Sequence, residues 1–149
     1  MLFKKPHKKI RMSKVFQKYT LKNIPTDRFL MTPLELYEYV DFDVKRIYFL
    51  SGTKKETGEH CHKEEKELFV MIQGSCTAII DKGNGKEEIS LEGPKEAIYV
   101  PNYIWHGFRN FSHDAILLAV SSTNYESDRS DYIEDYDEYL KIRDENLNK

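Results

Sequence analysis

Hydrophobic and polar residues alternate with a period of two through much of the chain, and this pattern is typical of β-strands with one buried face. The predicted strands span residues 44–50, 68–72, 76–81, 88–91, 97–100, 107–111 and 115–121. Asp81 begins the stretch Asp-Lys-Gly-Asn-Gly, which predicts a hairpin turn because glycine and asparagine tolerate positive φ. Short strands joined by such turns predict an all-β fold, a sandwich or a jelly-roll barrel whose mouth can hold a ligand.

The segment before the first predicted strand allows two interpretations. Residues 32–39 are compatible with a helical turn that has Thr32 as its N-cap and Pro33 at its first position. They are equally compatible with a strand in which Leu34 alternates with Glu35. The pattern does not separate these alternatives.

Near the C-terminus the apolar residues follow a helical spacing instead. After residue 130, apolar positions recur at steps of three and four residues, at Tyr132, Ile133, Tyr136 and Leu140. Because this spacing places them on one face of a helix, we expect an amphipathic helix that packs on the barrel. We expect its tyrosines to serve packing rather than catalysis.

Composition narrows the class of protein. With 149 residues, 40% of them hydrophobic and 32% charged, the chain has the size and composition of one soluble globular domain. Its longest apolar runs, such as residues 115–120, are too short to span a bilayer, so no membrane partner is expected. Residues 1–11 lack the apolar core of a secretory signal, and two cysteines fit a reducing compartment. We therefore expect a cytoplasmic protein.

Charge is unevenly distributed along the chain. The formal net charge of −2 and a pI near 6.2 give no signature of nucleic-acid binding. Basic residues gather near the N-terminus, at Lys4, Lys5, Lys8, Lys9, Arg11, Lys14 and Lys18. Residues 128–145 are mainly acidic, and we interpret both ends as solvated segments rather than docking surfaces. The predicted organisation is a basic N-terminal arm, residues 1–23, followed by a single domain, residues 24–149.

Three of the five histidines lie in two short blocks that suit one site. His60 and His62 are two residues apart, so on a strand their side chains point to the same face. Glu67 can return to that face on the same or the adjoining strand, and His106 adds a third imidazole. Cys61 would point to the opposite face, where we expect a small core residue without chemistry.

This set of side chains suits two kinds of chemistry. Imidazoles and a carboxylate are good ligands for a divalent transition metal, with positions left for water or substrate. The same groups without a metal can remove and return a proton, because histidine titrates near neutral pH. The residues alone leave both interpretations open.

Both histidine blocks resemble the motifs of the cupin family. Residues 52–74, with the His-x-His pair and Glu67, are similar to the first cupin motif. Residues 93–110, with His106 and Asn110, are similar to the second motif. The resemblance implies a cupin jelly-roll β-barrel, to which the predicted C-terminal helix is added.

A narrower resemblance extends over roughly residues 24–140. The stretches at 42–50, 60–63, 97–106 and 121–136 are similar in order and spacing to the dTDP-4-keto-6-deoxyglucose 3,4-ketoisomerases. These are metal-independent cupins that supply nucleotide sugars for bacterial surface polysaccharides. The resemblance implies an isomerase that needs no cofactor and moves the ketone of a dTDP-linked 4-keto-6-deoxyhexose from carbon 4 to carbon 3.

The same resemblance implies roles for individual residues. His60 matches the base that removes a proton from the sugar carbon, and Tyr48 matches a tyrosine that shuttles protons among the sugar oxygens. His62 would act with them, and His62 and His106 would donate hydrogen bonds to the developing oxyanion. Arg46 is a candidate for the diphosphate, because a guanidinium binds phosphate oxygens in a bidentate way. The expected substrate contacts are Arg46, Glu67, Tyr99, Trp105 and His106.

Two positions depart from the pattern of the ketoisomerases. Thr57 stands where they commonly have an arginine, and Glu67 stands where they commonly have glutamine. The carboxylate restores the ligand that metal-binding cupins use. The alternatives are therefore a metal-dependent cupin enzyme with His60, His62, Glu67 and His106 as ligands, or a non-catalytic module that binds sugar nucleotides.

We also predict a homodimer. Cupins often pair through edge strands, and the segment before residue 45 is a plausible strand to exchange between two copies.

Overall fold

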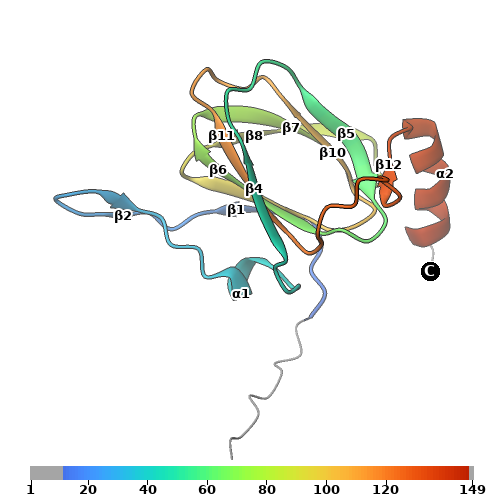
Figure 1. Cartoon of the computed structure of the whole chain (residues 1–149), viewed down its shortest axis with the longest axis horizontal. Coiled ribbons are helices and arrows are strands. Elements are labelled where there is room, and N and C mark those ends of the chain that lie inside the picture. Colours follow the sequence, from blue (N-terminus) through green and yellow to red (C-terminus); the bar gives the residue numbers. More distant parts are fainter. Residues whose placement is uncertain (1–11, 148–149) are drawn as a thin grey trace, which may run out of the picture.

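The computed structural model describes residues 12–147 and consists mainly of two antiparallel β-sheets that face each other (Figure 1). Sheet I has the strand order β1-β9-β6-β11-β4, and sheet II has the order β12-β5-β10-β7-β8. The strands of sheet I are β1 (Gln17–Thr20), β4 (Arg46–Leu50), β6 (Glu67–Gln73), β9 (Glu96–Val100) and β11 (Ile116–Ser121). Those of sheet II are β5 (Thr57–His62), β7 (Ser75–Asp81), β8 (Lys86–Glu92), β10 (Trp105–Arg109) and β12 (Tyr132–Ile133). The predicted all-β fold is confirmed.

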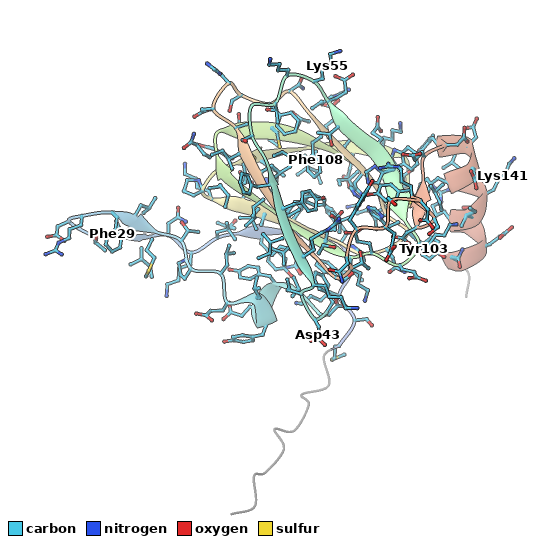
Figure 2. The ribbon with its side chains drawn as sticks, in the orientation of Figure 1. Phe29, Asp43, Lys55, Tyr103, Phe108 and Lys141 are labelled. Atoms are coloured by element: carbon cyan, nitrogen blue, oxygen red, sulfur yellow. The ribbon has the colours of Figure 1, made fainter. Side chains whose placement is uncertain are left out.

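The core lies between the two sheets and on the outer face of sheet I. Successive side chains of a strand point to opposite faces. Strand β6 therefore places Phe69 between the sheets, where its ring lies 4.7 Å from that of Phe108 of sheet II (Figure 2). The same strand places Leu68 on the outer face, in a second cluster with Tyr99 and residues of the N-terminal segment such as Val40. Residues 67–71 of β6 are therefore buried, whereas its last two residues are exposed.

The alternation of apolar residues located the main strands correctly. Each of the seven predicted segments coincides with a strand, although β10 begins at Trp105 rather than at residue 107. The predicted hairpin turn joins β7 to β8, and Gly83 and Gly85 adopt the positive φ that the turn requires, 118° and 95°. The list of predicted strands omitted β1, β5 and β12 of the two sheets, as well as two short strands at 24–25 and 30–31; all of these lack a long apolar alternation.

A short hairpin leaves the body of the molecule before the first long strand. Strands β2 (Ile24–Pro25) and β3 (Leu30–Met31) pair only with each other in the described part of the chain. Figure 1 shows them extending away from the two sheets, and Figure 2 shows Phe29 at the far end of the hairpin. The hairpin thus exposes Phe29, whose side chain is 58% accessible.

The two segments predicted to differ from the strand pattern, residues 32–39 and the segment after residue 130, both deviate from their predictions. Helix α1 (Leu36–Tyr39) is a single turn with Glu35 as its N-cap, so neither the start at Thr32 nor the strand alternative is correct. Helix α2 (Tyr136–Leu147) begins later than predicted, because Tyr132 and Ile133 instead form β12, which pairs with β5. Tyr136 and Leu140 of this helix do pack against the sheet, as predicted.

Part of the predicted N-terminal arm packs on sheet I. Strand β1 pairs with β9 from Gln17 to Thr20, and Leu21 is buried in the outer cluster of sheet I. The basic residues up to Arg11 lie outside the described residues. Within residues 12–147, no helix is long and apolar enough to cross a membrane.

Candidate active site

The histidines converge at one end of the space between the sheets. His60 and His62 lie on β5 and His106 lies on β10, directly opposite His60 in the pairing of the two strands. The ring centroid of His60 lies 4.8 Å from that of His62 and 4.9 Å from that of His106. The prediction that the three imidazoles form one cluster is confirmed.

Glu67 reaches this cluster from the other sheet. It is the first residue of β6 in sheet I, so the prediction that it lies on the same strand as the histidines, or on the adjoining one, is wrong. The turn at residues 63–66 carries the chain from one sheet to the other. One oxygen of Glu67, Oε2, lies 3.5 Å from Nε2 of His106 and 3.7 Å from Nε2 of His62. The site is therefore built across the space between the sheets.

Tyr48 contacts the same carboxylate. Its hydroxyl donates a hydrogen bond to Oε1 of Glu67, with a distance of 2.7 Å. Burial, followed by the negative charge of Glu67, raises the pKa of Tyr48 well above its ordinary value. Tyr48 therefore stays protonated near neutral pH and can donate its hydroxyl proton. One small cavity of about 70 Å³ lies between the sheets and is open to solvent at one side; Tyr48, His60, Glu67 and His106 are among the residues that line it.

Burial also determines the protonation of the histidines. Burial, together with the neighbouring imidazoles of His106 and His62, lowers the pKa of His60 to about 3. Burial similarly lowers the pKa of His62 to about 4, although the carboxylate of Glu67 opposes the shift. Both rings are therefore neutral at neutral pH. A neutral imidazole has a free electron pair, which a general base requires.

The tautomer of His106 is determined by the backbone. Its Nδ1 lies 2.9 Å from the carbonyl oxygen of Ile104, which can only accept, so Nδ1 carries the hydrogen. A neutral ring in this tautomer accepts a hydrogen bond at Nε2 and cannot donate one. The predicted donation from His106 to an oxyanion stays a prediction. Its Nε2 is buried and has no hydrogen-bond partner among residues 12–147.

Arg46 lies next to Tyr48 of the site, and its expected contact with the substrate stays a prediction. Its guanidinium donates to Oε1 of the buried Glu65 at 2.8 Å, and it lies over the rings of Tyr48 and Tyr125 at 5.0 and 5.6 Å. Its Nε is buried without a hydrogen-bond partner in the described part of the chain. Arg46 therefore retains donors for an anion even with Glu65 bound.

Two predicted substrate contacts face away from the site. Tyr99 lies on the outer face of sheet I, fully buried, where its hydroxyl donates to Asp41 at 2.5 Å. Trp105 lies beneath helix α2, where its Nε1 donates to Glu59 at 3.0 Å. Both residues neighbour an inward-facing residue in sequence, so the alternation of the strand turns them outward. Cys61 likewise packs with Trp105 beneath the helix, and its predicted role as a core residue is confirmed.

The sequence interpretation missed two residues of the site, Asp131 and Tyr132. The ring of Tyr132 lies 4.9 Å from that of His60 and 4.5 Å from that of His62, because β12 pairs with β5. Asp131 contacts Nδ1 of His62 at 3.1 Å. Both were assigned to a helix because of their spacing relative to Tyr136. One signal could have identified them: both lie in residues 121–136, a stretch that resembles the ketoisomerases.

The cluster also has the donors that a divalent cation requires. Ring nitrogens of His60, His62 and His106 lie within 4.8 Å of one another, and the carboxylate of Glu67 faces two of them. Neutral imidazoles and an ionised carboxylate are the ligand types that zinc, iron or manganese prefer. The residues therefore fit a metal as well as a proton-transfer site.

Comparison with known proteins gives consistent matches over most of the chain. The family model described as WxcM-like, C-terminal matches residues 14–144. The TDP-4-oxo-6-deoxy-alpha-D-glucose-3,4-oxoisomerase of Aneurinibacillus thermoaerophilus is 36% identical over 122 residues, which are 80% of this chain and 86% of that protein.

Solved structures agree with the sequence matches. A 3,4-ketoisomerase from Helicobacter canadensis superposes with a TM-score of 0.78 at 30% identity, covering 87% of this chain and 97% of that one. The sugar 3,4-ketoisomerase QdtA from Thermoanaerobacterium thermosaccharolyticum, solved in complex with TDP, has a TM-score of 0.79 at 25% identity. That match covers 87% of this chain and 95% of the other.

Proposed function

Since the chain belongs to the WxcM-like, C-terminal family, we propose that it is a TDP-sugar 3,4-ketoisomerase that acts on dTDP-4-keto-6-deoxy-D-glucose. Its relatives with this activity match it over most of their length. The observation that supports the reaction most directly is the shared cavity of His60 and Tyr48. It combines a neutral imidazole with a protonated hydroxyl, and the reaction requires both.

The reaction moves one hydrogen between two neighbouring carbons and leaves the redox state of the sugar unchanged. We assign the first step to His60, which removes the proton from carbon 3, so that the electrons of this bond form a carbon–carbon double bond. The carbonyl oxygen on carbon 4 takes a proton from Tyr48, which gives an enediol. The hydroxyl on carbon 3 then returns a proton to the phenolate of Tyr48 and becomes the new ketone, and carbon 4 receives a proton from the imidazolium of His60. Base and acid return to their starting states.

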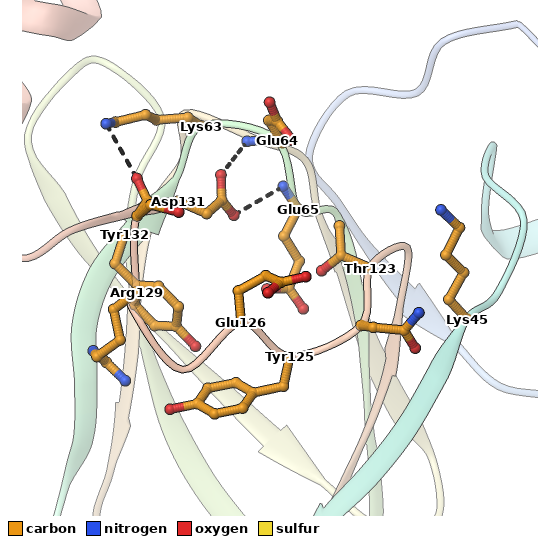
Figure 3. A pocket seen from close by; sticks show the side chains of 12 residues that line it. Lys45, Lys63, Glu64, Glu65, Thr123, Tyr125, Glu126, Arg129, Asp131 and Tyr132 are labelled. Carbon is orange, nitrogen blue, oxygen red and sulfur yellow. Dashed lines mark hydrogen bonds between the residues drawn. The ribbon is translucent and has the colours of Figure 1, made fainter.

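Substrate binding follows from the positions of the charged groups. The sugar would occupy the cavity between the sheets, and Arg46 at its mouth would bind the diphosphate with the donors that Glu65 leaves free. Tyr132 would cover the face of the sugar that lies next to His60. The thymidine group would lie further out, over the surface formed by Thr123, Tyr125 and Arg129 (Figure 3).

An exchange experiment in deuterium oxide tests the proposed reaction. We expect incubation of the protein with dTDP-4-keto-6-deoxyglucose to give a dTDP-3-keto-6-deoxyhexose with solvent deuterium on carbon 4, as measured by proton NMR. The heat-denatured protein serves as the control. Tight binding of the sugar nucleotide without deuterium on carbon 3 or carbon 4 would contradict the proposal, and would favour the non-catalytic binding module.

A metal-dependent enzyme is the second candidate, because Glu67 completes a set of three histidines and one carboxylate. In that case His60, His62, Glu67 and His106 would hold the ion, which would supply Lewis-acid polarisation of the ketone. We favour the metal-free reaction and expect purified protein to contain far less than one transition metal per chain by elemental analysis. We also expect activity to survive dialysis against a chelator. Stoichiometric metal that is lost together with activity would contradict the metal-free reaction.

We further propose that two copies of the chain form a dimer. The hairpin of β2 and β3 exposes apolar side chains, and so does β4, an edge strand of sheet I, on which Phe49 is 65% accessible. A second copy could cover both surfaces. We expect light scattering to give twice the chain mass of 17.7 kDa. Leu30→Asp should weaken the dimer, and a monomer of the unchanged protein at micromolar concentration would contradict it. The cytoplasmic location and the single domain after residue 23 stay predictions.

A further inference from the structure

The tail of the chain closes one side of the site. Residues 130–133 follow the last long strand and cross the end of β5, as Figure 3 shows from close by. The backbone amide of Lys63 donates to the carbonyl oxygen of Asp131 at 3.0 Å, and β12 pairs Tyr132 with His62. The tail therefore brings one carboxylate, that of Asp131, next to an imidazole of the site.

The carboxylate of Asp131 accepts from three donors at once. Its Oδ1 accepts the backbone amide of Glu64 at 2.7 Å, and its Oδ2 accepts that of Glu65 at 3.2 Å. The same Oδ2 lies 3.1 Å from Nδ1 of His62. With both oxygens already facing backbone donors, the carboxylate faces His62 as a hydrogen-bond acceptor.

The tautomer of His62 follows from this contact. An ionised carboxylate can only accept, so the hydrogen of a neutral His62 belongs on Nδ1. Glu65 reinforces this arrangement, because its Oε2 lies 3.4 Å from the same nitrogen. The electron pair of the ring is then on Nε2, which lies 3.7 Å from Oε2 of Glu67. Nδ1 thus faces an acceptor in both rings, the carboxylate of Asp131 for His62 and the carbonyl oxygen of Ile104 for His106.

We propose that Asp131 is a positioning residue that holds His62 with its hydrogen on Nδ1, so that Nε2 accepts a hydrogen bond from a hydroxyl of the sugar. This inference rests on the proposed ketoisomerase reaction, in which the hydroxyl on carbon 3 must lose its proton. It replaces the predicted role of His62 as a donor to an oxyanion. A hydroxyl-bearing sugar would supply such a donor to Nε2 of His62.

A merely structural role of Asp131 makes different predictions. If the carboxylate only fastened the tail to the turn at residues 63–66, its loss would lower stability and leave the tautomer of His62 unchanged. The variant Asp131→Asn separates these roles, because its side chain keeps the shape but has one accepting oxygen for three donors. Its amide nitrogen carries hydrogens and cannot accept from Nδ1 of His62.

The test uses the full chain with 15N-labelled histidine and has two readouts. In the unchanged protein we expect long-range nitrogen–proton NMR to show the hydrogen of His62 on Nδ1, with the signal assigned through His62→Gln. In Asp131→Asn we expect a shift toward the Nε2-protonated form, with kcat lower by about 10- to 100-fold, the range typical when the hydrogen-bond partner of a functional histidine is removed. The dissociation constant for TDP should stay within about twofold.

Controls make the result specific. Asp128→Asn is the matched variant, because this exposed carboxylate belongs to the same tail and, within residues 12–147, accepts only from Ser130 of its own turn. It should change neither the tautomer nor kcat. In the His62→Gln background, Asp131→Asn should have no further effect on kcat, since it acts through the ring that is gone.

A hydrogen on Nε2 of His62 in the unchanged protein would overturn the proposal, and this measurement does not require any variant to fold. An unchanged tautomer of His62 in Asp131→Asn would overturn it as well. So would a loss of kcat in the double variant equal to the product of the losses caused by Asp131→Asn and His62→Gln alone. If the unchanged protein shows the expected tautomer but no isomerase activity, the proposed reaction fails, and with it the assigned role of Nε2. The NMR measurement of the His62 tautomer in the unchanged protein and in Asp131→Asn would still show whether Asp131 positions the ring, because it does not depend on activity.

Discussion

Replacing His60 with asparagine is expected to lower the rate of isomerisation by about 10²- to 10⁴-fold, the contribution typical of a positioned general base. The ring of His60 is neutral because burial lowers its pKa to about 3, and it lines the cavity together with Tyr48. Asparagine keeps polar atoms at this position but cannot take up a proton. We expect the dissociation constant for TDP to change little, because the groups at the mouth of the site remain.

The measurement is the exchange of the proton on carbon 3 with deuterium oxide, followed by NMR, together with titration of TDP by calorimetry. His113→Asn is the matched control, because His113 is exposed and does not line the cavity. This control should exchange at the rate of the unchanged protein. Exchange by His60→Asn within about tenfold of that rate would show that another group is the base.

Replacing Tyr48 with phenylalanine is expected to lower kcat by about 10²-fold, the lower end of the range for a lost proton-transfer group. The change removes only the hydroxyl, which donates to Glu67 at 2.7 Å and whose raised pKa keeps it protonated. The oxygen on carbon 4 then loses the hydroxyl proton that Tyr48 supplies. Because the aromatic ring remains, the contact with the guanidinium of Arg46 and the binding of TDP should persist.

Tyr99→Phe provides a closely matched control for this variant. Tyr99 also donates its hydroxyl to a carboxylate, that of Asp41, but on the outer face of sheet I. Its loss should lower the free energy of unfolding by about 1–3 kcal/mol, as expected for a hydrogen bond to a charged group, and leave kcat unchanged. Equal losses of kcat in Tyr48→Phe and Tyr99→Phe would contradict the role assigned to Tyr48 and would indicate that Tyr99 belongs to the active site.

The sequence predicted the strands well where one physical rule applies to successive residues. A half-buried strand must alternate, so the alternation located β4, β6, β7, β8, β9, β10 and β11. The same rule brought His60 and His62 to one face and turned Cys61 to the other. The rule did not predict β12, because two residues are too few to display a period. The helical spacing between Tyr132 and Tyr136 is accidental.

The errors at the site have the same origin. Tyr99 and Trp105 were included because they lie within a stretch that resembles the ketoisomerases, but alternation directs each of them away from the cavity. The motif identified the segment, whereas the side of the sheet decides which of its residues reach the substrate. For a strand covered on both faces, such as β9, hydrophobic character does not distinguish the two sides.

The sequence by itself determined the family, the all-β class and the cluster of three histidines, since these depend on residue type and on spacing within short segments. Only the tertiary structure decided that Glu67 approaches the histidines from the opposite sheet, and that Asp131 and Tyr132 close the site from the tail. These contacts join residues that are far apart along the chain or separated by a change of sheet. They are set by how two twisted sheets and a returning tail pack together, and no local period records that packing.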